Sequence, residues 1–346
     1  MAAHPSPTVS PVEPPVDTRL PFEKIKREIL VRRQADTSPR YGCSPDDRPT
    51  ESLLTYGIIN LNKPSGPSSH QVSAYVQQIL GIDKSGHSGT LDPKVTGVLP
   101  VALGRGTRIV QTLLPAGKEY VCLMHLHKPV ERDVLRTVLS EFVGKIKQLP
   151  PVKSAVKRQY RFRRVYYIEL LDVLEQDVLF KTGTQAGTYI RKLVHDMGVR
   201  FGFGAHMTEL RRTKAGPFHE DDGHTLQDLA DAFHYYKEEN NDSYLRHVIR
   251  PIEEAVAHLP KCWVLDSTVE TLCHGADLKV PGIVKVESEI QIDELVAVMT
   301  LKGELIAVGP LKMLPKDILK ADKGVAIRIH KVFMQPGSYP KIEKAD

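Results

Sequence analysis

The sequence has few cysteines and no long apolar run, and both shortages exclude classes of protein. The four cysteines among 346 residues, at positions 43, 122, 262 and 273, form no C-x-x-C pair. We therefore expect reduced, mostly structural thiols and neither a zinc ribbon nor a disulfide framework. No stretch approaches about 18 consecutive apolar residues, and the N-terminus lacks the basic-then-apolar order of a secretory signal. These absences predict an intracellular protein without a membrane partner.

Signatures of nucleotide hydrolases and repeat proteins are also missing. No internal repeat of fixed period and no lysine-rich terminal block are visible. Segment 81–88 has the glycine spacing of a phosphate-binding loop, but His87 stands where that loop requires its lysine. A nucleotide hydrolase is therefore excluded.

What the sequence does contain is enough apolar material for two domains. It is 41% hydrophobic and 26% charged, and its length suggests two domains rather than one. We expect a disordered proline-rich arm at 1–20 and an extension at 21–56 that packs on the other domains. A main domain is expected at 57–259, followed at 260–340 by a small domain of short β-strands broken by glycines.

Hydrophobic periodicity predicts an α+β main domain, with mixed helices and strands that lack βαβ alternation. A strand is expected at 58–61, and a helix from the capping residue Ser68 to Gly81. Further strands are predicted at 120–126 and 165–180, and a further helix at 134–142. Two more helices are expected to open at Thr188 and Thr225.

Asp92 precedes Pro93 in a glycine-containing segment, and two interpretations are open. Asp92 is either a helix N-cap followed by proline in the first helical position, or a carboxylate on a rigid loop. Gly86, Gly89 and Gly97 would let other backbone or a substrate approach such a loop. A loop of this kind could present a nucleophile.

Arg191 is a candidate partner for this carboxylate. It falls in the first turn of a predicted helix, where the macrodipole disfavours a cation. It is either a solvated residue at a frayed helix end or a functional arginine that holds a buried aspartate ionised.

Tyr120 enters a strand and is by default a core aromatic. His125 and His127 lack a third ligand at conventional spacing, so we predict no metal there.

Basic residues concentrate between 153 and 164, interleaved with Tyr160 and Phe162. The formal net charge is only +5, so this concentration matters more than the total. Cations neutralise phosphates and aromatic rings stack on unpaired bases, so we favour a nucleic-acid contact on a hairpin over a merely solvated face. The cluster comprises Lys153, Lys157, Arg158, Arg161, Arg163 and Arg164, with a smaller one at Arg211, Arg212 and Lys214.

Taken together, these segments resemble, in order, the motifs of TruB-type pseudouridine synthases. The motifs are LNKPSG at 61–66, HSGTLDP at 87–93, GVLPV at 97–101, KEY at 118–120, GTYIR at 187–191, and LRRT at 210–213 with GPF at 216–218. Over about 21–340 the chain more narrowly resembles the dyskerin branch, the catalytic subunits of box H/ACA ribonucleoproteins. LPAGKEY at 114–120, MHLH at 124–127, SAVKR at 154–158 and HGADL at 274–278 carry this narrower likeness.

The resemblance implies a pseudouridine synthase domain of mixed and antiparallel sheet, followed by a β-barrel PUA domain that binds RNA. By motif, Asp92 would be the nucleophile, paired with Arg191, and Tyr120 would stack on the target base. His87 and Leu210 would be on the substrate side of the site. Lys63 is assigned there too, with a structural role in its loop. The 153–164 hairpin and Arg211 would contact RNA.

The reaction needs neither redox chemistry nor external energy, so no cofactor and no metal is expected. The implied partners are a box H/ACA guide RNA, substrate rRNA or tRNA, and the small protein subunits of the particle. Alternatives are a free-standing tRNA pseudouridine synthase and a non-catalytic RNA-binding scaffold. The missing lysine-rich tail favours an archaeal, cytoplasmic protein over a nucleolar eukaryotic one.

Overall fold

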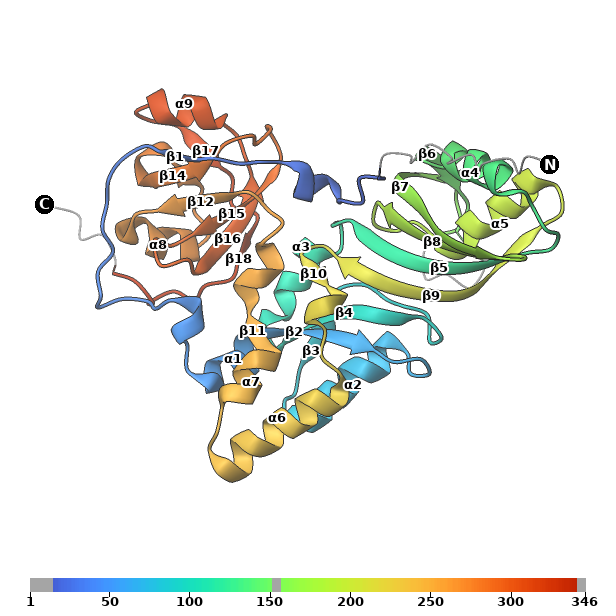
Figure 1. The fold of residues 1–346 in the computed structure, drawn as a ribbon. Helices are drawn as coiled ribbons and strands as arrows, with labels where there is room; N and C mark the ends of the chain where they lie inside the picture. The colour runs from blue at the N-terminus through green and yellow to red at the C-terminus, as the bar shows by residue number, and fades with distance from the viewer. Residues whose placement is uncertain (1–14, 151–156, 341–346) are drawn as a thin grey trace, which may run out of the picture.

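The protein is described by a computed structural model over residues 15–150 and 157–340. It has the predicted α+β architecture, with a large mixed sheet in the main domain and a smaller sheet in the C-terminal domain (Figure 1). Lys153 and the first fourteen residues lie outside the described residues. All four cysteines are free thiols, as predicted. No helix of the described part is long and apolar enough to cross a membrane.

The large sheet runs in the order β11-β2-β4-β9-β5-β8-β7-β6, with β3 added to β4 and β10 to β9. Its strands pair antiparallel except β4 with β9, which are parallel. The bounds are β2 (Gly57–Lys63), β3 (Ser85–His87), β4 (Thr96–Leu103), β5 (Lys118–Leu126), β6 (Gly144–Gln148), β7 (Arg161–Leu174), β8 (Asp177–Thr184), β9 (Ala205–Ala215), β10 (Phe218–His219) and β11 (Ile249–Pro251).

Helices cover this sheet in two groups, each burying an apolar stripe. Next to β2 and β4 lie α2 (Ser69–Leu80) and α6 (Leu226–Glu239), and both begin at the predicted capping boxes, Ser68 with Gln71 and Thr225 with Asp228. Against β5, β7 and β8 pack α4 (Arg132–Glu141) and α5 (Ile190–Phe201). The shorter helices are α1 (Thr50–Tyr56), α3 (Val110–Leu113) and α7 (Ser243–Val248).

The small domain is built on the sheet order β1-β14-β12-β15-β16-β18, with β13 paired to β17 beside it. Its β1 (Ile29–Val31) comes from the N-terminal extension and pairs with β14 (Ile283–Glu287), so the extension completes this sheet (Figure 1). The other elements are β12 (Lys261–Val264), α8 (Asp266–Cys273), β13 (Leu278–Lys279), β15 (Leu295–Met299), β16 (Leu305–Pro310), α9 (Pro315–Lys320), β17 (Val325–Ile327) and β18 (Lys331–Val332).

Residues 15–20 belong to the described structure, although proline content predicted a disordered arm there. Leu20 is fully buried, and it lies against the position where Gly117 enters β5. Glu23, in the 3₁₀ turn Pro21–Lys24, pairs with Lys214 at 3.0 Å. The prediction placed the boundary by proline content and did not recognise Leu20 as a buried apolar residue.

The two domains share one continuous apolar core. Ile58, Val98 and Ile252 of the main domain belong to the same buried cluster as Met299 and Leu305 of the small domain. Burial of this kind, at about 25 cal/mol per Å² of apolar surface, favours a fixed arrangement of the two domains.

A buried ion pair reinforces the same junction. Arg48 of the extension donates two hydrogen bonds, of 2.8 and 2.7 Å, to Glu253, and the Leu305 amide donates to the same carboxylate at 2.9 Å. The N-terminal extension, the main domain and the small domain therefore meet at the Glu253 carboxylate.

His258, at the junction, makes stability depend on pH. Burial lowers the pKa of its imidazole from 6.5 to about 4. The folded state therefore favours the neutral ring, and stability is lost as the pH falls through 6.5 towards 4. Between about pH 7 and pH 5 we expect this group to cost about 2 kcal/mol. Denaturant unfolding at both pH values should show a smaller loss for His258→Gln than for the wild type. An equal loss would contradict the assignment, and His234→Gln, at an exposed helix position, is the control.

Candidate active site

Asp92 lies on the loop between β3 and β4, where no helix follows it. The Val95 amide donates to the Asp92 carbonyl at 2.9 Å, which closes a β-turn with Pro93 at its second position. The helix-cap interpretation of Asp92-Pro93 is therefore wrong. The Asp92 side chain is 55% exposed, so the expectation of a buried aspartate is also wrong.

Lys63 holds one side of this loop. It is fully buried, and its ammonium donates to the carbonyls of Pro64, Pro93 and Val95 at 2.8 to 2.9 Å. Burial lowers the pKa of this ammonium, with a further contribution from nearby Arg212. All three contacts are to backbone, so Lys63 has the structural role expected of it, and its assignment to substrate binding is not supported by this geometry.

Removing the Lys63 ammonium should loosen the Asp92 loop. Lys63→Met leaves three carbonyls without their shared donor, and we expect a loss of about 2–3 kcal/mol in the free energy of unfolding. Chemical denaturation measures this loss. Lys94→Met, at an exposed position two residues beyond Asp92, is the matched control and should be neutral. Equal stability of Lys63→Met and wild type would contradict the role of Lys63 in holding the Asp92 loop.

Ser69 and Arg212 hold the loop from two other directions. The buried Ser69 hydroxyl accepts from the Leu91 amide at 2.8 Å. Arg212 is 2% exposed and donates to the carbonyls of Val98 at 2.7 Å and Gly89 at 3.2 Å. Gly97 permits this approach, because a Cβ there would lie 2.1 Å from the Arg212 carbonyl oxygen. The backbone on both sides of Asp92 is thus fixed by buried polar side chains.

Arg191 reaches Asp92 from the start of α5. It is the second residue of α5, and its guanidinium donates to the Asp92 carboxylate, with both side chains more than half exposed. The first turn of α5 contains no acidic residue. Gln148 of β6, which is buried, instead accepts from the Tyr189 amide at 3.0 Å and donates to its carbonyl at 3.1 Å. No sequence pattern indicated that Gln148 would contact this turn, because the contact joins residues 41 positions apart.

Tyr120 is linked to the Asp92 loop through Arg212. The two residues are directly opposed on β5 and β9, and the Tyr120 side chain lies near enough to the buried Arg212 guanidinium to influence its charge. Burial lowers the pKa of Arg212, and Tyr120 opposes that shift. Leu210 opposes Cys122 two positions along and packs, like Tyr120, against the core under α5. Tyr120 and Leu210 therefore lie on the sheet face that is covered by α5, the helix that carries Arg191.

The basic hairpin is partly described. Lys157 and Arg158 are exposed, and the strand β7 alternates Arg161 and Arg163 with Phe162 and Arg164. A Cβ on Gly187 would lie 3.2 Å from the Arg163 Nε, so Arg163 sits beside the segment that leads into Arg191. The Nε atoms of Arg161 and Arg163 are buried without a hydrogen-bond partner in the described part.

The outer side of the hairpin combines rings and cations. Phe162 is 57% and Tyr160 64% exposed. Lys145 lies 4.3 Å from the ring centre of Phe162, and Lys147 lies 4.4 Å from that of Tyr160. This arrangement can neutralise phosphates and stack on bases.

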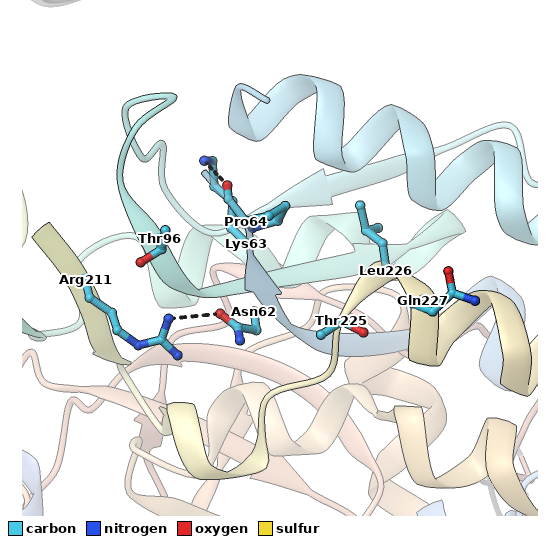
Figure 2. Close-up of a pocket in the computed structure, with 8 residues that line it drawn as sticks. All are labelled: Asn62, Lys63, Pro64, Thr96, Arg211, Thr225, Leu226 and Gln227. Carbon is cyan, nitrogen blue, oxygen red and sulfur yellow. Dashed lines mark hydrogen bonds between the residues drawn. The ribbon is translucent and has the colours of Figure 1, made fainter. Parts of the chain in front are cut away.

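The predicted second basic cluster does not form a free cationic surface. Arg212 is buried, Lys214 is paired with Glu23, and Arg211 donates to Glu220 at 2.6 Å and to Asn62 at 3.3 Å. Figure 2 shows Arg211 turned towards Asn62 across a pocket of about 370 Å³. Lys63 and Pro64 line this pocket, whereas Asp92, Tyr120 and Arg191 do not. The carboxylate and amide partners make Arg211 a weaker phosphate ligand than expected.

A third histidine lies near His125 and His127 in space, although none lies at conventional spacing in the sequence. His206 of β9 is 5.3 Å from each of the two rings, centre to centre, and its Nδ1 is 3.1 Å from the His127 Nε2. Antiparallel pairing of β5 with β9 creates this group. Across 15–150 and 157–340, no three His, Cys, Asp or Glu side chains are placed to hold a metal ion.

A solvent-accessible carboxylate on a rigidly held loop, oriented by an arginine and flanked by a cationic, aromatic hairpin, has the character of an RNA-modifying enzyme. Family models narrow this class. The TruB family pseudouridylate synthase N-terminal domain matches 77–190 and the tRNA pseudouridylate synthase B C-terminal domain matches 191–257. The DKCLD domain matches 17–73 and the PUA domain 260–333.

Whole-chain relatives agree with these models. Probable tRNA pseudouridine synthase B of Methanopyrus kandleri is 53% identical over 94% of this chain and 96% of its own length. The Pyrococcus abyssi protein of the same name is 54% identical over 92% of this chain and 96% of its own length. The chain therefore belongs to the TruB family of pseudouridine synthases, with DKCLD and PUA domains, and is an isomerase of RNA uridine. The likeness seen in its motifs is confirmed.

Two solved structures resemble the chain along almost its whole length. One, an H/ACA RNP bound to a substrate RNA containing 2′-deoxyuridine, has a TM-score of 0.88 and 50% identity, covering 94% of this chain and all of that one. The other, a Cbf5-Nop10-Gar1 complex, has a TM-score of 0.89 and 52% identity, and the match covers 94% of this chain and 99% of that one. Both resemble the main domain and the PUA domain together.

Proposed function

We propose that this chain is the catalytic subunit of a box H/ACA ribonucleoprotein and isomerises uridines that a guide RNA selects in ribosomal RNA or tRNA. The observation that carries the proposal is the likeness to H/ACA protein structures over 94% of the chain, including the extension that supplies β1. Its partners are the guide RNA, the substrate RNA and small subunits equivalent to Nop10 and Gar1.

Asp92 is the proposed nucleophile. The N1–C1′ bond of uridine breaks, the freed uracil turns, and a C5–C1′ bond forms, while the proton lost from C5 is balanced by one gained at N1. A carboxylate can carry C1′ during the turn, either as a covalent ester or as the counter-ion of a sugar cation. Arg191 keeps the carboxylate oriented for either route.

The target base must leave its helix to reach Asp92. Flipping costs a few kcal/mol, and contacts to the flipped nucleotide and the RNA backbone must offset that cost. Tyr120 would stack on the base, and His87 and Leu210 would contact the nucleotide. The hairpin residues Lys157 and Arg158, with Arg161, Arg163 and Arg164, would bind phosphates on either side.

A free-standing tRNA enzyme is the second candidate, because the curated relatives are named as probable tRNA pseudouridine synthases. A scaffold without catalysis is the third, and the clamped Asp92 loop argues against it, because RNA binding alone does not require that loop. We propose a cytoplasmic, archaeal setting, in line with the archaeal relatives.

Co-purification from the native host distinguishes the first two candidates. Sequencing RNA bound to the affinity-purified chain should recover box H/ACA guide RNAs together with small protein subunits. Recovery of tRNA alone, with full tRNA modification by the isolated chain, would instead establish the free-standing enzyme.

A further inference from the structure

His87 contacts a second histidine at the edge of the site. His87 ends β3 and immediately precedes the Asp92 loop, and His70 lies in the first turn of α2. The His87 Nε2 is 3.4 Å from the His70 Nδ1, and the two rings meet edge to face with centres 4.8 Å apart. His70 is exposed, so this contact is not a packed core contact.

The other ring nitrogen of His87 is the unusual one. Its Nδ1 is buried and has no hydrogen-bond partner among the described residues. A buried nitrogen without a partner costs free energy, so such a group is retained where a ligand completes its hydrogen bond. A neutral imidazole carries one donor nitrogen and one acceptor nitrogen. If the His87 Nε2 donates to His70, the His87 Nδ1 is an acceptor, and if Nε2 accepts, Nδ1 is a donor. The contact with His70 therefore determines whether the His87 Nδ1 donates or accepts.

The start of α2 already organises the site in two other ways. Ser68 caps the helix by accepting from the Gln71 amide, and Ser69 holds Leu91 beside the nucleophile. The next residue, His70, faces His87. Three consecutive residues thus fix the helix, the Asp92 loop and the His87 ring.

We propose that His70 is a positioning residue that orients the His87 imidazole so that its Nδ1 is presented to the bound nucleotide. This inference rests on the proposed function, in which His87 contacts the flipped uridine. Burial, then His70, then Arg212 lower the pKa of His87, and this keeps the ring neutral, as the pairing requires.

Substitutions at His70 test this in the reconstituted particle with a defined guide and substrate RNA under single-turnover conditions. His70→Ala should lower the rate about five- to tenfold, the effect of one lost hydrogen bond. His70→Asn keeps a polar atom at the Nδ1 position and should stay within about twofold of wild type. The acid limb of the pH–rate profile should move to higher pH in His70→Ala, because removing His70 raises the His87 pKa.

A double-mutant cycle separates positioning from a general structural effect. In the His87→Ala background, His70→Ala should cause no further loss. A wild-type rate for His70→Ala, an equal loss in both backgrounds, or failure of His70→Asn to restore the rate would each overturn the proposal. His234→Ala, on an exposed helix surface, is the control. Failure of the proposed function itself would differ, since wild type would then form no guide-directed pseudouridine.

Discussion

Asp92→Asn should abolish pseudouridine formation while leaving the protein folded. An amide cannot act as a nucleophile towards C1′ or balance positive charge on the sugar, so we expect a loss of about 10⁴-fold, or about 5.5 kcal/mol of transition-state stabilisation. The isostere keeps the turn at 92–95, because that turn is closed by backbone. Single-turnover conversion of a labelled RNA measures the loss.

The exposure of Asp92 makes this variant informative. Exposed ion pairs contribute about 0–1 kcal/mol, so breaking the contact with Arg191 should barely change the free energy of unfolding. Asp83→Asn, at another exposed aspartate before the same loop, should be fully active. Retention of more than about a tenth of wild-type activity by Asp92→Asn would remove Asp92 from the proposed role.

Arg191→Ala should have the second-largest effect, about 10²- to 10³-fold on the rate. Without its guanidinium partner the Asp92 carboxylate can rotate away from C1′, and small misplacements of a reacting group cost about 10²-fold. Arg191→Lys should recover part of the rate, because an ammonium keeps the charge without the planar fork of donors.

Arg200→Ala provides the matched control on the same helix. Arg200 donates two hydrogen bonds to Glu141 in another surface ion pair, near the C-terminal end of α5. Its loss should leave the rate within about twofold of wild type, since only a surface pair is removed. If the two arginine variants lost activity equally, general damage to α5 would explain the result better than orientation of Asp92.

Local structure was predictable where side chains act on nearby backbone. The capping boxes at Ser68 and Thr225 and the left-handed Gly81 fix α2 and α6 through contacts within a few residues. The hydrophobic pattern also predicted correctly that Arg191 lies in the first turn of a helix. The start of α5 was placed two residues early, because Gln148, which hydrogen bonds to the backbone of the N-cap residue Tyr189, comes from a distant strand.

Long-range features could not be predicted, because sheet pairing creates them. Arg212 looked like a surface cation in a run of basic residues, but parallel pairing of Gly97 with Arg212 buries it between Tyr120 and the Asp92 loop. His206 reaches His125 only through antiparallel register. The exposure of Asp92 is likewise a property of the assembled loop, and motif spacing alone cannot distinguish it from a buried carboxylate.

Guide-directed modification is the central claim, and position-resolved detection of pseudouridine tests it most directly. The reconstituted particle would be given one substrate RNA and, in turn, two guides that designate different uridines. We predict that pseudouridine appears at the designated uridine, moves when the guide is exchanged, and is absent with Asp92→Asn. Modification at one fixed uridine whichever guide is present, or an unchanged yield with Asp92→Asn, would contradict this account.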